Sequence, residues 1–387
     1  MRADAQPSTA DRRWIKSPAW DLVWVSECAV VGPRDPAAGA GSRRRARQPG
    51  GRAVLRLAVP LWFGHRVSSA WLAYATPAYR PLLATQRLRF VVAPLAIAVA
   101  CFAVLLAPES VLPMPLTERV VWLAVLDYLL VSYHFAAQHF GLLSLYRARA
   151  GRASDAIARR LDRWFALVVG GGFVVLAKAL AGSIAFQDRW IDPLLGAGGS
   201  DMFARTLRDG GIVFVVILTA LMLRVELRSQ RPSLPRVAYV LGVSAMVLFA
   251  FLARDPFLFI VLWSVQHWSA AMGLASLAAS GGAQAPGAHW QRLLAPINRR
   301  GWAVLLVLAV VSTAAAAGVG GGGRDRRIRL RRPHLRRCGA GGCAHRPSCR
   351  RCWHWASRAG FIHYLLDRAA FRFSSPDVRK AARGLLK

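Results

Sequence analysis

Histidines stand inside long apolar stretches of this chain, where side chains that ionise or hydrogen-bond are rare. They are His65, His134, His139 and His267, with His363 as a further case near the C-terminus. Such groups are costly in the low-dielectric interior of a bilayer unless other groups satisfy them. Neutral imidazole is also a good ligand for iron, zinc or copper. We therefore predict that the first four histidines bind a transition metal, with His363 as an additional candidate ligand.

The segment 120–146, VVWLAVLDYLLVSYHFAAQHFGLLSLY, contains two of these histidines and is the clearest candidate for a membrane span. As a helix it would be about 40 Å long, enough to cross the hydrocarbon core. Asp127, His134 and Gln138 are spaced by seven and four residues, so they share one helical face. We predict that Asp127 and Gln138 orient the ligating histidines by hydrogen bonds. His139 lies about 140° around the helix from His134 and should face a different neighbour.

The same histidines have an alternative interpretation without metal, in which they bridge helices, cap helix ends or line a polar path. The segment HFAAQH lacks the paired HxxHH motifs of membrane-bound oxygenases and desaturases, so no family is inferred from it. Two functions stay open. One is a histidine-metal-dependent membrane enzyme of the oxidoreductase class, acting on a lipid-soluble substrate. The other is a transporter or structural membrane protein, so whether the protein is an enzyme is undecided.

Composition indicates a helical membrane protein. The 387 residues are 55% hydrophobic with a mean hydropathy of +0.33, and their apolar runs are separated by short charged loops. We predict an all-α polytopic membrane bundle. Its predicted location is a cell membrane, specifically the inner membrane of a bacterium. Gly170 to Gly172 should let a neighbouring helix approach closely. The eight readable spans are 53–75, 90–107, 120–146, 164–186, 211–223, 237–253, 257–279 and 302–319.

Positive charge predicts the orientation of these spans. The loops after the first, third, fifth and seventh spans are rich in arginine, which places them on the cytoplasmic side.

The net charge of +33 would by itself suggest a nucleic-acid partner. However, twelve arginines and one acid fall within 324–358, which is about a third of the net charge. We therefore expect the lipid bilayer and a lipophilic small molecule as partners, and no nucleic acid.

The chain divides into four parts by composition. Residues 1–52 are predicted to be a disordered basic segment, and 53–319 form the transmembrane helical domain. Residues 320–358 are an anomalous Arg- and Cys-rich segment. Residues 359–387 are predicted to leave the membrane and end in a short amphipathic helix, with Ser375 as its N-cap and Pro376 at its first position.

The anomalous segment breaks the charge rule, because an eighth span would deliver its arginines to the outside. We hypothesise that 320–358 is translated out of frame and replaces a ninth span, and that 1–52 has a similar origin or a misplaced start. Translating the other two frames of the coding DNA tests this, and the hypothesis fails if neither gives an apolar run of about 20 residues leading into residue 361. The alternative is a zinc site, whose candidate ligands are Cys338, Cys343, Cys349, Cys352, His345 and His354.

Overall fold

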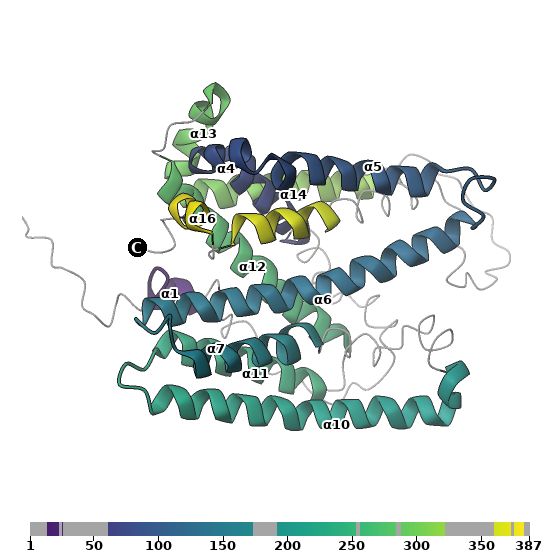
Figure 1. Ribbon diagram of the computed structural model, residues 1–387, viewed down its shortest axis with the longest axis vertical. Helices are drawn as coiled ribbons and strands as arrows, with labels where there is room; N and C mark the ends of the chain where they lie inside the picture. Colours follow the sequence, from purple (N-terminus) through teal and green to yellow (C-terminus); the bar gives the residue numbers. More distant parts are fainter. Residues whose placement is uncertain are drawn as a thin grey trace, which may run out of the picture. The chain divides into compact units, whose positions relative to one another are not determined.

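The computed structural model describes residues 14–22, 25, 61–172, 192–252, 256–283, 288–321, 360–372 and 375–382. Every regular element in these ranges is a helix, so the all-α prediction is confirmed for them (Figure 1). The chain divides into two compact units. Unit 1 comprises Met1–Ala58, Val131–Leu277 and Ala382–Lys387, and unit 2 comprises Val59–Leu130 and Ala278–Ala381. Residues 320 and 321 of the anomalous segment end a helix, and residues 322–358, with the segment's four cysteines, lie outside the described residues.

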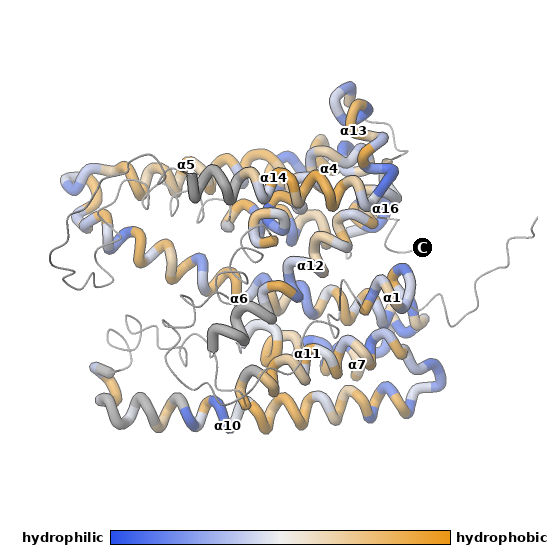
Figure 2. Tube along the Cα trace, turned by 180° about the vertical axis from the view of Figure 1, so that it is seen from behind, coloured by the Kyte–Doolittle hydropathy of each residue, from blue (hydrophilic) through white to orange (hydrophobic). Residues whose placement is uncertain are grey.

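Unit 1 is built around the packing of α7 and α11 against α10 (Figure 1). Gly196, at φ +68°, interrupts α10 and precedes its apolar part, Arg205–Leu227. Figure 2 shows this part as a mainly apolar tube. The elements of unit 1 are α1 (Pro18–Asp21), α6 (Leu116–Arg149) from residue 131, α7 (Ala156–Phe165), the π-helix η6 (Ala166–Gly172), α10 (Asp192–Leu227), α11 (Leu234–Leu252) and α12 (Pro256–Gly282) as far as Leu277.

Hydrogen bonds of one buried asparagine link two short helices of unit 2. Asn298 accepts a hydrogen bond from the Trp71 indole at 2.9 Å and donates to the Ala75 carbonyl at 2.8 Å, which joins α13 to η3. The last helix begins at Pro376, as predicted. The elements are a helix over 61–70, η3 (Trp71–Ala75), η4 (Pro77–Tyr79), α4 (Arg80–Thr85), η5 (Leu88–Val92), α5 (Ala93–Leu106), α6 up to residue 130, α13 (His289–Arg299), α14 (Gly301–Gly321), a helix over 360–370 and α16 (Pro376–Ala381).

Three helices of the described chain are long and apolar enough to cross a membrane: Leu88–Leu106, Leu116–Arg149 and Arg205–Leu227. The pair His289–Arg299 and Gly301–Ala314, bent by 106°, makes a fourth if it is one span. The predicted sixth span is helical, but its apolar stretch Leu234–Phe249 is shorter. The structure thus supports three or four candidate spans and leaves the number eight as a prediction. Parts of the predicted first and fourth spans, and the last residue of the sixth, lie outside the described residues.

The N-terminal segment differs from the expected disorder wherever it is described. The Asp21 carboxylate is buried and accepts hydrogen bonds from the backbone N–H of Ile15 at 2.8 Å and from the Tyr146 hydroxyl at 3.0 Å. Farther along, the Gln266 side chain donates to the Val25 carbonyl at 2.7 Å. Residues 14–22 and 25 are therefore an ordered part of unit 1. Their order could not be predicted from composition, because it depends on polar contacts with two distant helices and not on a local helical or strand pattern.

Two glycines at the end of unit 1's η6 lie against α6, as the sequence predicts. A Cβ on Gly170 would lie 2.7 Å from Cδ2 of His139. A Cβ on Gly171 would lie 2.7 Å from the Ser132 carbonyl oxygen and 2.9 Å from the Ala136 Cβ. These distances leave no room for a methyl group, so glycine is what permits the close approach of η6 to α6.

Replacing Gly171 by alanine is expected to lower the free energy of unfolding by about 1–3 kcal/mol, because backbone atoms must shift to admit the methyl group. The measurement is chemical unfolding of the purified protein in detergent. Gly141→Ala is the matched control on α6, since a Cβ there meets nothing within 4 Å. That control should be neutral or stabilising by up to about 1 kcal/mol. Equal effects of the two substitutions would contradict the packing argument.

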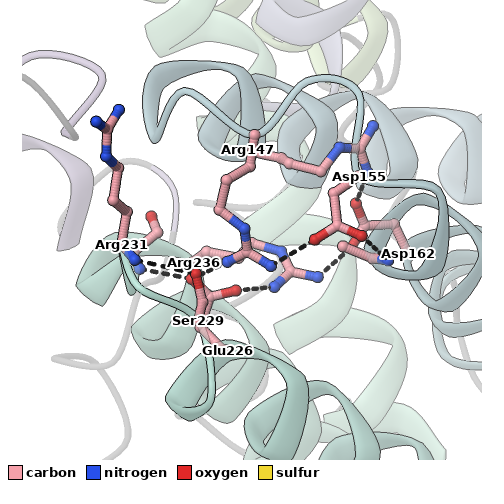
Figure 3. A network of polar contacts seen from close by, with 10 residues as sticks. Arg147, Asp155, Asp162, Glu226, Ser229, Arg231 and Arg236 are labelled. Carbon is pink, nitrogen blue, oxygen red and sulfur yellow. Dashed lines mark hydrogen bonds and ion pairs between the residues drawn. The ribbon is translucent and has the colours of Figure 1, made fainter.

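A network of six charged side chains joins the helix ends of unit 1 (Figure 3). Asp162 on α7 accepts hydrogen bonds from Arg147 of α6 and, at 2.5 Å, from Arg236 of α11. Arg236 also pairs with Glu226 of α10. Arg152 completes the network by pairing with Glu226 at 2.9 Å and with Asp155 at 2.8 Å. Three arginines thus meet three carboxylates.

The network holds two loops of unit 1 next to each other. These loops follow α6 and α10, and both are among the loops that the charge pattern assigns to the cytoplasmic side. Asp155 is also the N-cap of α7, where its side chain accepts a 2.9 Å hydrogen bond from the Ala158 N–H. That hydrogen bond, followed by the pair with Arg152, lowers the pKa of the Asp155 carboxyl. The ion pairs bring the two loops together, and their cytoplasmic location stays a prediction.

Candidate metal centre

Two of the predicted ligands lie together in unit 1. The Nε2 atoms of His134 on α6 and His267 on α12 are 3.1 Å apart. Their ring centroids are 4.8 Å apart and the ring planes cross at 84°. Both side chains are buried, with 4% and 1% of their surface exposed. The pair therefore places two imidazole nitrogens next to each other in a buried site.

This geometry fits two ligands on one metal ion. With metal–nitrogen bonds of about 2.0–2.1 Å, ligand angles between a right angle and the tetrahedral value place the nitrogens about 2.8–3.4 Å apart. The same angles place the ring centroids about 4.5–5.2 Å apart. The observed separations of 3.1 Å and 4.8 Å fall within both ranges. A direct hydrogen bond between the two imidazoles, one as donor and one as acceptor, also has this nitrogen separation.

The surroundings hold His267 in place from several sides. Gln138, one helical turn beyond His134, donates its side-chain N–H to the His267 carbonyl at 3.0 Å. The Phe135 ring lies against the His267 ring, with a centroid separation of 3.7 Å. The neighbouring Gln266 is held by the Val25 carbonyl. Gln138 thus orients the backbone of His267, whereas the sequence predicted that it would orient an imidazole.

His139 contacts a different helix, as its angular position predicts. Its Nδ1 atom is 2.5 Å from the hydroxyl of Tyr239 on α11, and the two rings lie 5.9 Å apart. The structure therefore separates His139, which faces α11, from His134, which faces α12. Tyr239 was not singled out from the sequence, because a single tyrosine in an apolar span gives no signal of its partner.

Unit 2 contains a second pair of histidines, His65 and His363. Their ring centroids are 4.1 Å apart, closer than the range for two imidazoles on one metal. The Nδ1 atom of His363 is 3.1 Å from Oγ of Ser69, and the Ser69 hydroxyl donates to Asp367 at 2.9 Å. This pair is thus arranged for ring packing and a chain of hydrogen bonds. No signal in the sequence pointed to Ser69, because it lies 294 positions before His363. Asp367, four residues after His363, was predicted to mark the membrane exit.

Asp127 lies in unit 2 and contacts the helix over 360–370. The Tyr364 hydroxyl donates to its Oδ1 atom at 3.1 Å. A Cβ on Gly360 would lie 2.6 Å from the same oxygen and 3.1 Å from the Arg66 guanidinium. Asp127 therefore has a tyrosine and an arginine in its surroundings. The prediction that it orients a metal-ligating histidine stays a prediction.

The comparisons with known proteins add no functional information. No family model, curated protein or solved structure matches the chain. The two histidine pairs are therefore the features of the described chain from which a function can be inferred.

Proposed function

We propose that the protein is a multi-pass integral membrane protein, of a bacterial inner membrane, that binds a transition metal through His134 and His267. The observation that carries this proposal is the 3.1 Å separation of two buried Nε2 atoms on different helices. Iron, zinc and copper all accept neutral imidazole ligands. His65 and His139 remain sequence-predicted ligands, and neither is needed for the pair in unit 1.

The proposed activity is that of an oxidoreductase on a lipid-soluble substrate. Two imidazoles leave further coordination positions for other groups, as catalytic metal sites require. The apolar helices around the pair favour a substrate that partitions into the bilayer. The proposed topology is eight spans, with the basic loops on the cytoplasmic side.

A second candidate function is a transporter or structural membrane protein without metal. It is favoured by the hydrogen-bond chain His363–Ser69–Asp367 in unit 2, because polar groups in membrane helices often line a path or join helices. Metal analysis of the purified full-length protein in detergent distinguishes the two functions. Stoichiometric iron, zinc or copper supports the first function. Its absence after reconstitution with each metal would exclude it.

A further inference from the structure

Helix α7 presents a basic face with two large apolar side chains. Ile157 and Trp164 are 67% and 55% exposed, and Arg160 stands between them. The spacings of three and four residues place all three on one face of the helix. Arg159 and Arg163 lie on the adjacent stripe and are also exposed. This outward face, defined by these five residues, carries three cations and no acid.

The ion network determines which side of α7 points outward. Ala158, Asp162 and Phe165 form the buried side of the helix. Asp162 is the only acidic residue of α7, and it is held by Arg147 and Arg236 from two other helices (Figure 3). It is therefore not available to neutralise the outward arginines. Rotation of α7 would break both ion pairs, so the outward face is a fixed feature of unit 1.

We propose that the outward face binds the phosphate headgroup of an anionic phospholipid in the cytoplasmic leaflet. Guanidinium groups bind phosphate oxygens with two parallel hydrogen bonds. The side chains of tryptophan and isoleucine sit well at the boundary between headgroups and acyl chains, where indole is enriched. A free phosphate ion would satisfy the arginines and leave both apolar side chains in water. The three arginines and the two exposed apolar side chains together therefore favour an anionic phospholipid over a free phosphate ion.

The proposal rests on the membrane topology proposed above and is independent of the metal. Helix α7 follows the arginine-rich end of α6, in a loop that the charge pattern places on the cytoplasmic side. The cytoplasmic leaflet carries the anionic lipids and a negative surface potential that attracts such segments. Loss of metal binding would therefore leave this proposal standing. If the loop lay on the side of the membrane opposite the cytoplasm, the lipid-binding proposal would be wrong.

The test is a titration of the purified full-length protein in detergent with short-chain phosphatidylglycerol, followed by native mass spectrometry. Phosphatidylcholine and inorganic phosphate are titrated in parallel. Wild-type protein is expected to bind phosphatidylglycerol more tightly than either. Arg160→Gln should weaken this binding about fivefold, and the triple change Arg159→Gln, Arg160→Gln and Arg163→Gln about 100-fold. Arg205→Gln, which removes an exposed charge from α10, is the matched control and should have no effect.

Two results would overturn the proposal. One is binding of phosphatidylcholine or inorganic phosphate as tight as that of phosphatidylglycerol, which would show that neither headgroup charge nor lipid is selected. The other is unchanged phosphatidylglycerol binding in the triple variant. Circular dichroism and thermal melting establish that the triple variant is folded, which is expected because the three arginines are exposed and Asp162 is retained. A double change of Ile157→Ser and Trp164→Ser should weaken lipid binding and leave any phosphate binding unaltered.

Discussion

His134→Ala and His267→Ala are each expected to abolish stoichiometric metal binding by the purified protein. Removing one imidazole leaves a single nitrogen from the 3.1 Å pair, and an isolated nitrogen cannot chelate. Changes to residues that merely support metal ligands already lower affinity about 10- to 100-fold, so loss of a ligand should cost at least about 100-fold. Metal content is measured by elemental analysis after dialysis against a buffered metal solution. The full-length protein in detergent is used throughout.

His289→Ala is the control for this experiment, because His289 is an exposed histidine on α13. It should retain the wild-type metal content. Parallel His65→Ala and His139→Ala variants test the sequence prediction that those residues are also ligands. Normal metal content in both His134→Ala and His267→Ala would refute the metal centre and favour the hydrogen bond between the two imidazoles.

Asp162→Asn is expected to destabilise the protein by about 3–5 kcal/mol. The substitution removes the carboxylate that faces both Arg147 and Arg236 and leaves their charges only partly compensated in a buried site. Arg236 retains Glu226, so Arg147 should bear most of the loss. Adding Arg147→Met should therefore restore part of the stability. The free energy of unfolding is measured by chemical denaturation in detergent.

Asp209→Asn is the matched control for the ion network. Asp209 pairs with Arg208 at 2.8 Å, but its side chain is 63% exposed. Exposed pairs contribute about 0–1 kcal/mol, so this change should have a small effect. An effect of Asp162→Asn as small as that of the control would show that the network does not hold α7 in place.

Several local features could be predicted from the sequence because they depend on nearby residues. Apolar runs and their charged borders predicted α5, α6, α11 and α12 closely, and Pro376 predicted the start of α16. Helical periodicity separated His139 from His134, and the structure confirms that they face different helices. The glycines at 170 and 171 also lie where a neighbouring helix approaches. Each of these predictions needs only the helical rise and turn.

Contacts between distant residues could not be predicted in this way. Nothing local to Asp162 shows that its partners are Arg147 and Arg236, so the sequence showed only two basic loops. The N-terminal segment appeared featureless, yet Asp21 is anchored to Tyr146 at 3.0 Å. Gln138 was predicted to orient an imidazole, but it donates to the backbone carbonyl of His267, a distant residue. A hydrogen-bonding side chain shows that a partner is needed and does not identify it.

The sequence by itself determined that this protein is helical, that several of its helices are apolar enough for a membrane, and that histidines lie within them. Those properties follow from composition and from a period of 3.6 residues, which are local. The tertiary structure decided which histidine meets which. It pairs His134 with His267 and His65 with His363, because helix packing brings together residues that are more than a hundred positions apart.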